Sequence, residues 1–205
     1  GAEGLRVQAA HHDAVVVRLL LHHAERHRHL RRSAGAVETQ LDRAPRECNA
    51  QPAGVDQHDL PAALEGAALA DQLLVAAGQF QEFLKHPPPR QWTLLRNSRR
   101  FDNWSFCELL LDTGFDAIYD DPHRTLDLCR MGVAIAERLS PEGYGERAIE
   151  DLRARAWGRV ANALRATSDL AGAEEALTTA ARHLKVGSGE PLEEAEHLYF
   201  TASLH

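Results

Sequence analysis

Apolar residues recur at helical spacing through the second part of the chain, from about residue 91 onward. This part has no runs of alternating β-branched residues, which would mark half-buried strands, and none of the Asn-Gly or Asp-Gly pairs typical of tight hairpin turns. The segments between the periodic stretches are short, so consecutive helices should pack antiparallel. The pattern therefore predicts an all-α fold made of antiparallel helical hairpins.

Capping residues, prolines and glycines delimit the helices in this part. A capping residue precedes a proline at Asp121-Pro122 and at Ser140-Pro141, and residues 167–169 offer further caps. Glycines at 187 and 189 end a helix, and Pro191 opens the last one. We expect helices at about 91–111, 121–139, 140–166 and 169–187 and from 191 onward, the third interrupted early by two glycines.

The first ninety residues differ in composition. They contain only two aromatic residues, Phe80 and Phe83, and prolines 87–89 separate them from the rest. Helical spacing predicts one helix over 60–85, capped by Asp59. We expect residues 1–58, with few large apolar side chains, to be poorly ordered, or to derive from an upstream start or a shifted reading frame. The predicted organisation is 1–58 as this poorly ordered part, 59–90 as an isolated helix and proline-rich linker, and 91–205 as a helical repeat domain.

One predicted hairpin carries a recognisable motif. Residues 157–180 read Trp-x2-Val-Ala-x2-Leu-x8-Ala-x3-Leu-x2-Ala. The first four positions form one stripe on a helix, and the last three form a stripe on the next helix. Small residues in such stripes let two helix axes approach to about 8–10 Å, while the bulky ones fill the space beside them. The predicted packing residues are Trp157, Val160, Ala161, Leu164, Ala173, Leu177 and Ala180.

This motif resembles the tetratricopeptide repeat (TPR), whose signature is Trp-x2-Leu-Gly-x2-Tyr, then Ala-x3-Phe and a late Pro. A degenerate earlier copy begins at Trp104, and a third copy would start near Leu198. Ala161 stands for the signature glycine, and Lys185 lies where the proline would be. The resemblance covers roughly residues 99–205 and extends to bacterial proteins with repeats of this kind. It implies a short TPR-like α-solenoid, truncated at its C-terminal end; an unrelated helical bundle is the alternative.

Composition disfavours nucleic-acid-binding, disulfide-rich, membrane and secreted proteins. The formal net charge of −7 disfavours a nucleic-acid-binding protein, since such proteins usually carry a basic domain. Three cysteines without paired spacing do not form a disulfide framework. The apolar run Ala14–Leu21 is shorter than the roughly 20 residues that cross a bilayer, and its context does not fit a signal peptide. We therefore expect a cytoplasmic protein that binds neither nucleic acid nor membranes.

Three clusters of residues could form a metal-binding or nucleic-acid-binding site, but each has a simpler explanation. His23 and His27 can share a helix face, yet no further zinc ligand is evident nearby. Arginines and aromatic residues alternate over 92–104, as they do in proteins that bind single-stranded nucleic acid. The same pattern fits a helical hairpin whose aromatic residues form the core and whose arginines face the solvent. The acidic residues of 112–121 lack the spacing of a calcium loop. We expect no metal, no cofactor and no catalytic residues.

The sequence therefore predicts a non-enzymatic protein–protein interaction module. TPR-like repeats leave a concave surface on which a peptide or helix can lie. Polar residues on the first helix of the motif, namely Arg153, Arg159 and Asn162, are the predicted partner contacts. The alternative is the sensor or regulatory portion of a bacterial transcription regulator or signalling protein, with its effector domain elsewhere.

Overall fold

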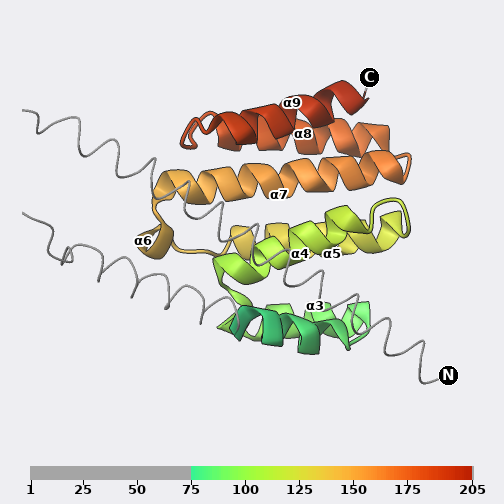
Figure 1. The fold of residues 1–205 in the computed structure, drawn as a ribbon, viewed down its shortest axis with the longest axis vertical. Helices are drawn as coiled ribbons and strands as arrows, with labels where there is room; N and C mark the ends of the chain where they lie inside the picture. The colour runs from blue at the N-terminus through green and yellow to red at the C-terminus, as the bar shows by residue number, and fades with distance from the viewer. Residues whose placement is uncertain (1–74, 205) are drawn as a thin grey trace, which may run out of the picture. The chain divides into compact units, whose positions relative to one another are not determined.

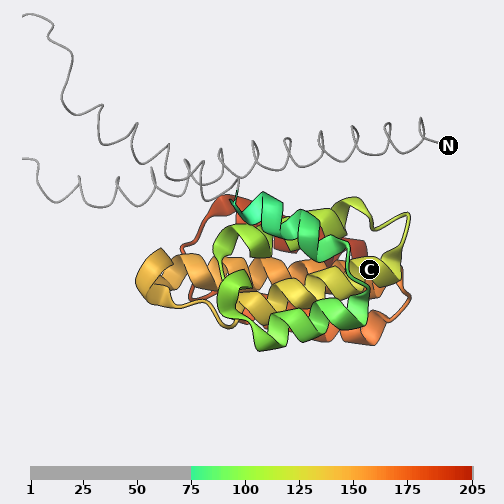
Figure 2. The ribbon, with the colours of Figure 1, turned by 90° about the horizontal axis from the view of Figure 1, so that it is seen from below.

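The computed structural model describes residues 75–204, and every regular element in this range is helical. The predictions for residues 1–58, the histidine cluster and most of the helix 60–85 lie outside the described residues. A helical segment at 75–84, blue-green in Figure 2, comes first. It is followed by α3 (Pro88–Asn97), η1 (Arg99–Phe101), α4 (Trp104–Asp116), α5 (Pro122–Ala136), α6 (Pro141–Tyr144), α7 (Glu146–Ala166), α8 (Leu170–Leu184) and α9 (Pro191–Leu204). The all-α prediction is confirmed for this part of the chain.

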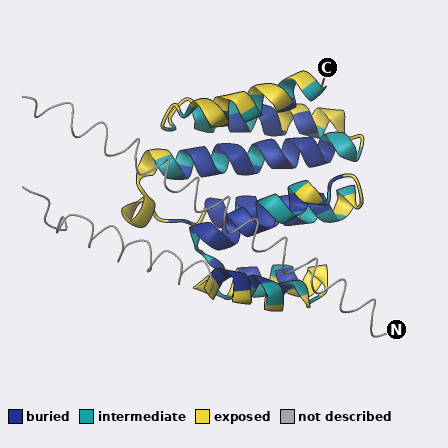
Figure 3. Ribbon diagram, in the orientation of Figure 1, coloured by how far each residue is buried: buried dark blue, intermediate teal, exposed yellow. Residues whose placement is uncertain are grey.

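Helix α7 lies in the middle of the fold, with α8 and α9 on one side and α4 and α5 on the other (Figure 1). Short connections join α4 to α5 and α7 to α8, so each of these pairs is a helical hairpin. The two hairpins meet where α5 packs against α7, and α9 lies against both α7 and α8. Most of the 21 residues of α7 are consequently buried (Figure 3). A helix with so little exposed surface is the organising element of the core.

The capping predictions are confirmed at two helix starts. The carboxylate of Asp121 accepts a hydrogen bond from the backbone N–H of Arg124 at the start of α5. Asp169 accepts one from the N–H of Gly172 at the start of α8. Each bond satisfies a donor that would otherwise lack a partner in the first turn.

The single helix predicted at about 91–111 is wrong. Ser98 has extended backbone angles, with φ −142° and ψ 128°, and separates α3 from η1. The side chain of Asn103 then caps α4 by accepting a hydrogen bond of 2.8 Å from the N–H of Phe106. Ser and Asn both compete for backbone hydrogen bonds, which favours helix ends over helix interiors. These two residues therefore divide the apolar pattern into two helices.

The structure also differs from the expected division near residue 90. The compact unit that includes the second part begins at Ala76, so residues 76–90 belong to it. Phe80 and Phe83 are buried, and both rings contact Phe106 edge to face at 5.7 and 5.3 Å between centroids. Pro88 and Pro89 start α3, where a missing N–H costs no helical hydrogen bond. The prolines thus join two packed helices rather than forming a linker.

Gly145 separates α6 from α7 in a backbone conformation that favours glycine. Its φ of 84° and ψ of 142° lie in a region that other residues rarely adopt. We predict that Gly145→Ala lowers the free energy of unfolding by about 1–3 kcal/mol through backbone strain. Gly143→Ala is the matched control, because Gly143 lies in α6 with open space around its Cα. Urea unfolding of both variants measures the difference, and equal stabilities would contradict the strain at Gly145.

Within residues 75–204, no helix combines the length and the apolar character needed to cross a membrane.

Candidate interaction site

The predicted packing residues on α7 and α8 are buried, with Trp157 as the exception. Val160, Ala161 and Leu164 on α7 and Ala173, Leu177 and Ala180 on α8 are each no more than 7% exposed. The indole of Trp157 is half-buried, and its Nε1 has no hydrogen-bond partner. Because the three alanines are almost completely covered, these positions leave no room for larger side chains. Helices α7 and α8 pack against each other, and the role of the stripes in that contact stays a prediction.

The three predicted partner contacts are engaged within the protein instead. Asn162 is buried, and its Oδ1 accepts a hydrogen bond of 3.0 Å from Arg165. Arg153 donates from Nε to the carbonyl of Ala136 and pairs with Glu150, so it completes the C-terminal end of α5. Arg159 is only 8% exposed. The predicted contact surface on α7 is covered because helices lie against α7 from both sides.

Arg155 and Arg159, one turn apart on α7, form the centre of a buried charged ladder. Its other members are Glu108 and Asp112 on α4 and Glu193 and Glu196 on α9. The Nη1 atom of Arg155 lies 2.5 Å from Glu108 Oε1, while its Nη2 atom lies 2.5 Å from Glu193 Oε1. One guanidinium therefore joins three helices.

The second rung of the ladder centres on Arg159. Its Nη2 lies 2.7 Å from Glu196 Oε1 and 4.0 Å from Asp112 Oδ1. The guanidinium carbon also lies 3.8 Å from the ring centroid of Phe115 on α4, a cation–π arrangement. Two buried nitrogens of Arg159, Nε and Nη1, have no hydrogen-bond partner. The ladder therefore fixes α7 between α4 and α9, with less complete hydrogen bonding at this rung.

Burial and neighbouring charges shift the pKa of Arg155 in opposite directions. Burial favours the neutral guanidine and would lower its pKa, but Glu193 and neighbouring carboxylates more than offset this, so the pKa is raised. Arg155 therefore remains a cation. The ladder was missed in the sequence, although its members recur at i, i+3 or i, i+4 on each of the three helices. The helical spacing of these charged residues was the one sign of the ladder that the sequence offered.

Two further buried ionisable groups, Cys107 and Asp151, are bonded to the backbone. Burial raises the pKa of Cys107 to about 12, and its thiol donates to the carbonyl of Gly132. A protonated, enclosed thiol is not a nucleophile. Asp151 accepts hydrogen bonds from the N–H of Ser188, and burial raises the pKa of its carboxyl. Asp151 therefore holds the segment between α8 and α9, which is a structural role.

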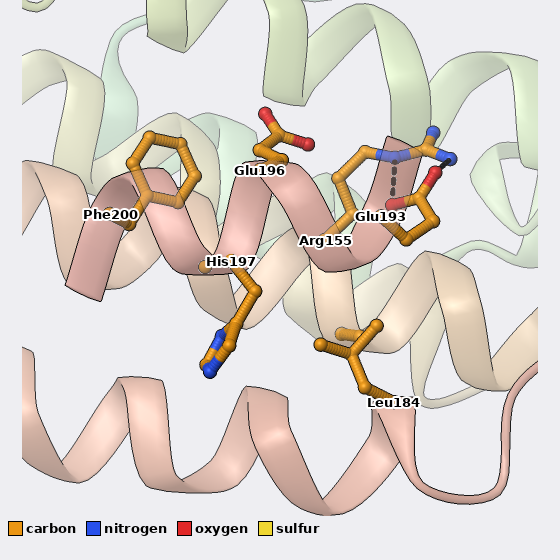
Figure 4. A pocket seen from close by; sticks show the side chains of 8 residues that line it. Arg155, Leu184, Glu193, Glu196, His197 and Phe200 are labelled. Atoms are coloured by element: carbon orange, nitrogen blue, oxygen red, sulfur yellow. Dashed lines mark hydrogen bonds and ion pairs between the residues drawn. The ribbon is translucent and has the colours of Figure 1, made fainter. Parts of the chain in front are cut away.

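A pocket between α7 and α9 has a volume of only about 10 Å³. Arg155, Glu193, His197 and Phe200 are among the side chains around it (Figure 4). Small-molecule sites have volumes of about 300–1,000 Å³. The pocket between α7 and α9 is far smaller and holds at most one water. Among the described residues, no group of three or more His, Cys, Asp or Glu side chains could hold a metal ion. This pocket cannot hold a substrate.

The outer face of α9 is the most distinctive surface of the C-terminal helices. We use this name for five exposed apolar residues that follow one side of the helix: Leu192, Ala195, Leu198, Tyr199 and Ala202. Leu198 and Tyr199 are 65% and 60% exposed. The opposite side of α9 carries the buried Glu193 and Phe200, which face the rest of the protein (Figures 3 and 4). Exposed apolar patches are common where proteins contact a partner.

Comparison with known proteins identifies no relative: no protein-family model, no curated protein and no solved structure matches the chain. The function is therefore inferred from the geometry itself.

Proposed function

We propose that this chain is a non-enzymatic protein–protein interaction module of the TPR-like kind, acting in the cytoplasm. The observation that carries the proposal is the outer face of α9, where large apolar side chains lie in water on a regular helix. A solvated face of this type loses water-exposed apolar area when a partner covers it, and this burial favours association.

The arrangement of the hairpins supports the repeat interpretation. The pair α4/α5 is followed by the pair α7/α8, and α9 then packs on both helices of the second pair. In a stack of helical hairpins, each new first helix meets the preceding hairpin in this way. On this interpretation, α9 is the first helix of a further repeat.

The state of the polar groups supports binding over catalysis. Arg155, Glu108 and Glu193 are buried in ion pairs, and the pocket beside them has room for one water at most. An active site needs titratable groups that converge on a space where a substrate can lie.

Photo-crosslinking tests the proposed function. With benzoylphenylalanine in place of Tyr199, we predict a discrete covalent adduct with one protein in cells that express the full chain. The matched control places the same group at Tyr119, which is 88% exposed but lies outside the outer face of α9. The adduct should be absent there. Equal labelling at both positions, or none at position 199, would contradict a partner site on α9.

A further inference from the structure

Helix α9 has an inner side that packs on the protein and an outer face that is apolar and exposed. The inner side includes Phe200 and the ion-paired Glu193, and the outer face is apolar along the helix. An apolar side of a helix is normally covered by a neighbour. The outer face of α9 therefore fits a second helix packed along it.

The α7/α8 hairpin offers a comparison within the same molecule. On α7, Trp157, Val160, Ala161 and Leu164 lie at i, i+3, i+4 and i+7, and α8 packs against this helix. On α9, Ala195, Leu198, Tyr199 and Ala202 have the same spacing and are exposed. On α8, the buried side consists of Ala173, Ala176, Leu177 and Ala180. A narrow, alanine-rich side of this kind lets a helix approach a bulky stripe closely.

Charge indicates the orientation of a helix bound to this face. Glu190 and Glu194 lie at the N-terminal end of α9, and no acidic residue follows Glu196 on this helix. An antiparallel helix places its C-terminal end at this acidic end, so basic residues there would be attracted. The α7/α8 hairpin already has this pairing, because His183 near the end of α8 lies 2.6 Å from Glu150 near the start of α7. Helix α8 also carries Arg182 and Lys185 at that end.

We propose that the outer face of α9 binds an amphipathic helix that lies antiparallel to α9, with alanines along its buried side and basic residues at its C-terminal end. This inference rests on the proposed function and specifies the class of partner. The bound helix covers Leu198 and Tyr199 with its alanine side, and its basic end lies beside Glu190 and Glu194.

The α8 sequence itself provides the probe. A labelled peptide of residues 168–186, stapled between the exposed positions Glu174 and Thr178, is titrated with the full chain by fluorescence anisotropy. The staple is needed because a helix of this length is marginally stable alone. We expect saturable binding, weakened at least about tenfold by Leu198→Asp or Tyr199→Asp, a loss of about 1.4 kcal/mol or more. Both side chains are exposed, so the variants should keep the circular dichroism of the parent chain.

Two matched controls accompany this titration. Leu170→Asp changes a leucine on α8 that is 55% exposed and should leave peptide binding unchanged. A peptide with Arg182→Glu and Lys185→Glu should bind at least several-fold more weakly, and raising the salt concentration should reduce the difference from the parent peptide. Equal binding by both peptides would overturn the predicted orientation.

Two other outcomes would overturn the inference. If crosslinking from position 199 captures a partner while the α8 peptide does not bind, the proposed function stands and the class of partner is wrong. If the full chain is a dimer by light scattering, and Leu198→Asp makes it monomeric while Leu170→Asp does not, a second copy covers this face. A monomer that binds the peptide supports the proposal.

Discussion

Arg155→Met is expected to lower the free energy of unfolding by about 3–5 kcal/mol, because removal of one partner leaves buried charges uncompensated. Glu108 and Glu193 both lie against this guanidinium, and the side chains of all three residues are no more than 6% exposed. Methionine retains most of the length of the arginine but none of its charge. Urea unfolding followed by circular dichroism at 222 nm measures the change.

Two further variants make the Arg155 prediction specific. Arg182→Met removes an exposed arginine and should change stability by no more than about 0.5 kcal/mol. The triple variant Glu108→Gln, Arg155→Met, Glu193→Gln should recover part of the loss, because it also removes the buried negative charges. A loss of less than about 1 kcal/mol for Arg155→Met would mean that water reaches the ladder.

Phe83→Ala should cost about 3–5 kcal/mol, the range for truncating a buried aromatic side chain. The ring of Phe83 is 1% exposed and lies 5.4 Å from the ring of Phe101 and 5.3 Å from that of Phe106, centroid to centroid. The loss should appear in the unfolding of α4 to α9, because these rings share one core. Thermal unfolding monitored by tryptophan fluorescence reports on that part, since all three tryptophans lie after Phe83.

Tyr119→Ala is the control for Phe83→Ala. It also truncates an aromatic side chain of the same unit, but one that is 88% exposed, so it should be nearly neutral. If Phe83→Ala were equally neutral, the segment before the prolines would be independent of the rest. The division near residue 90 expected from the sequence would then hold.

The sequence was most informative where a local signal decides the structure. The caps Asp121 and Asp169 act within three residues of themselves, so the starts of α5 and α8 could be predicted. The prolines at 88 and 89 were ambiguous, because proline both ends helices and starts them. Only the burial of Phe80 and Phe83 shows that these prolines start a packed helix.

Side-chain roles on α7 were harder to predict than helix positions. Arg159 and Asn162 are polar, and polar residues are usually exposed, which favoured a partner surface. The structure buries both because α4 and α9 approach α7 from either side. That arrangement depends on residues far apart in the chain, which a helical pattern does not reveal.

The charged ladder has a consequence for how this fold comes apart. Arg155 joins residues 47 and 38 positions away along the chain, on helices before and after its own. Arrays of helical repeats, whose units touch only their neighbours, can fray from one end a hairpin at a time. Here the unfolding of α9 would remove Glu193 from Arg155 and leave that buried guanidinium without one of its two carboxylates. Stepwise fraying is therefore penalised, and the helices should melt together in one cooperative transition.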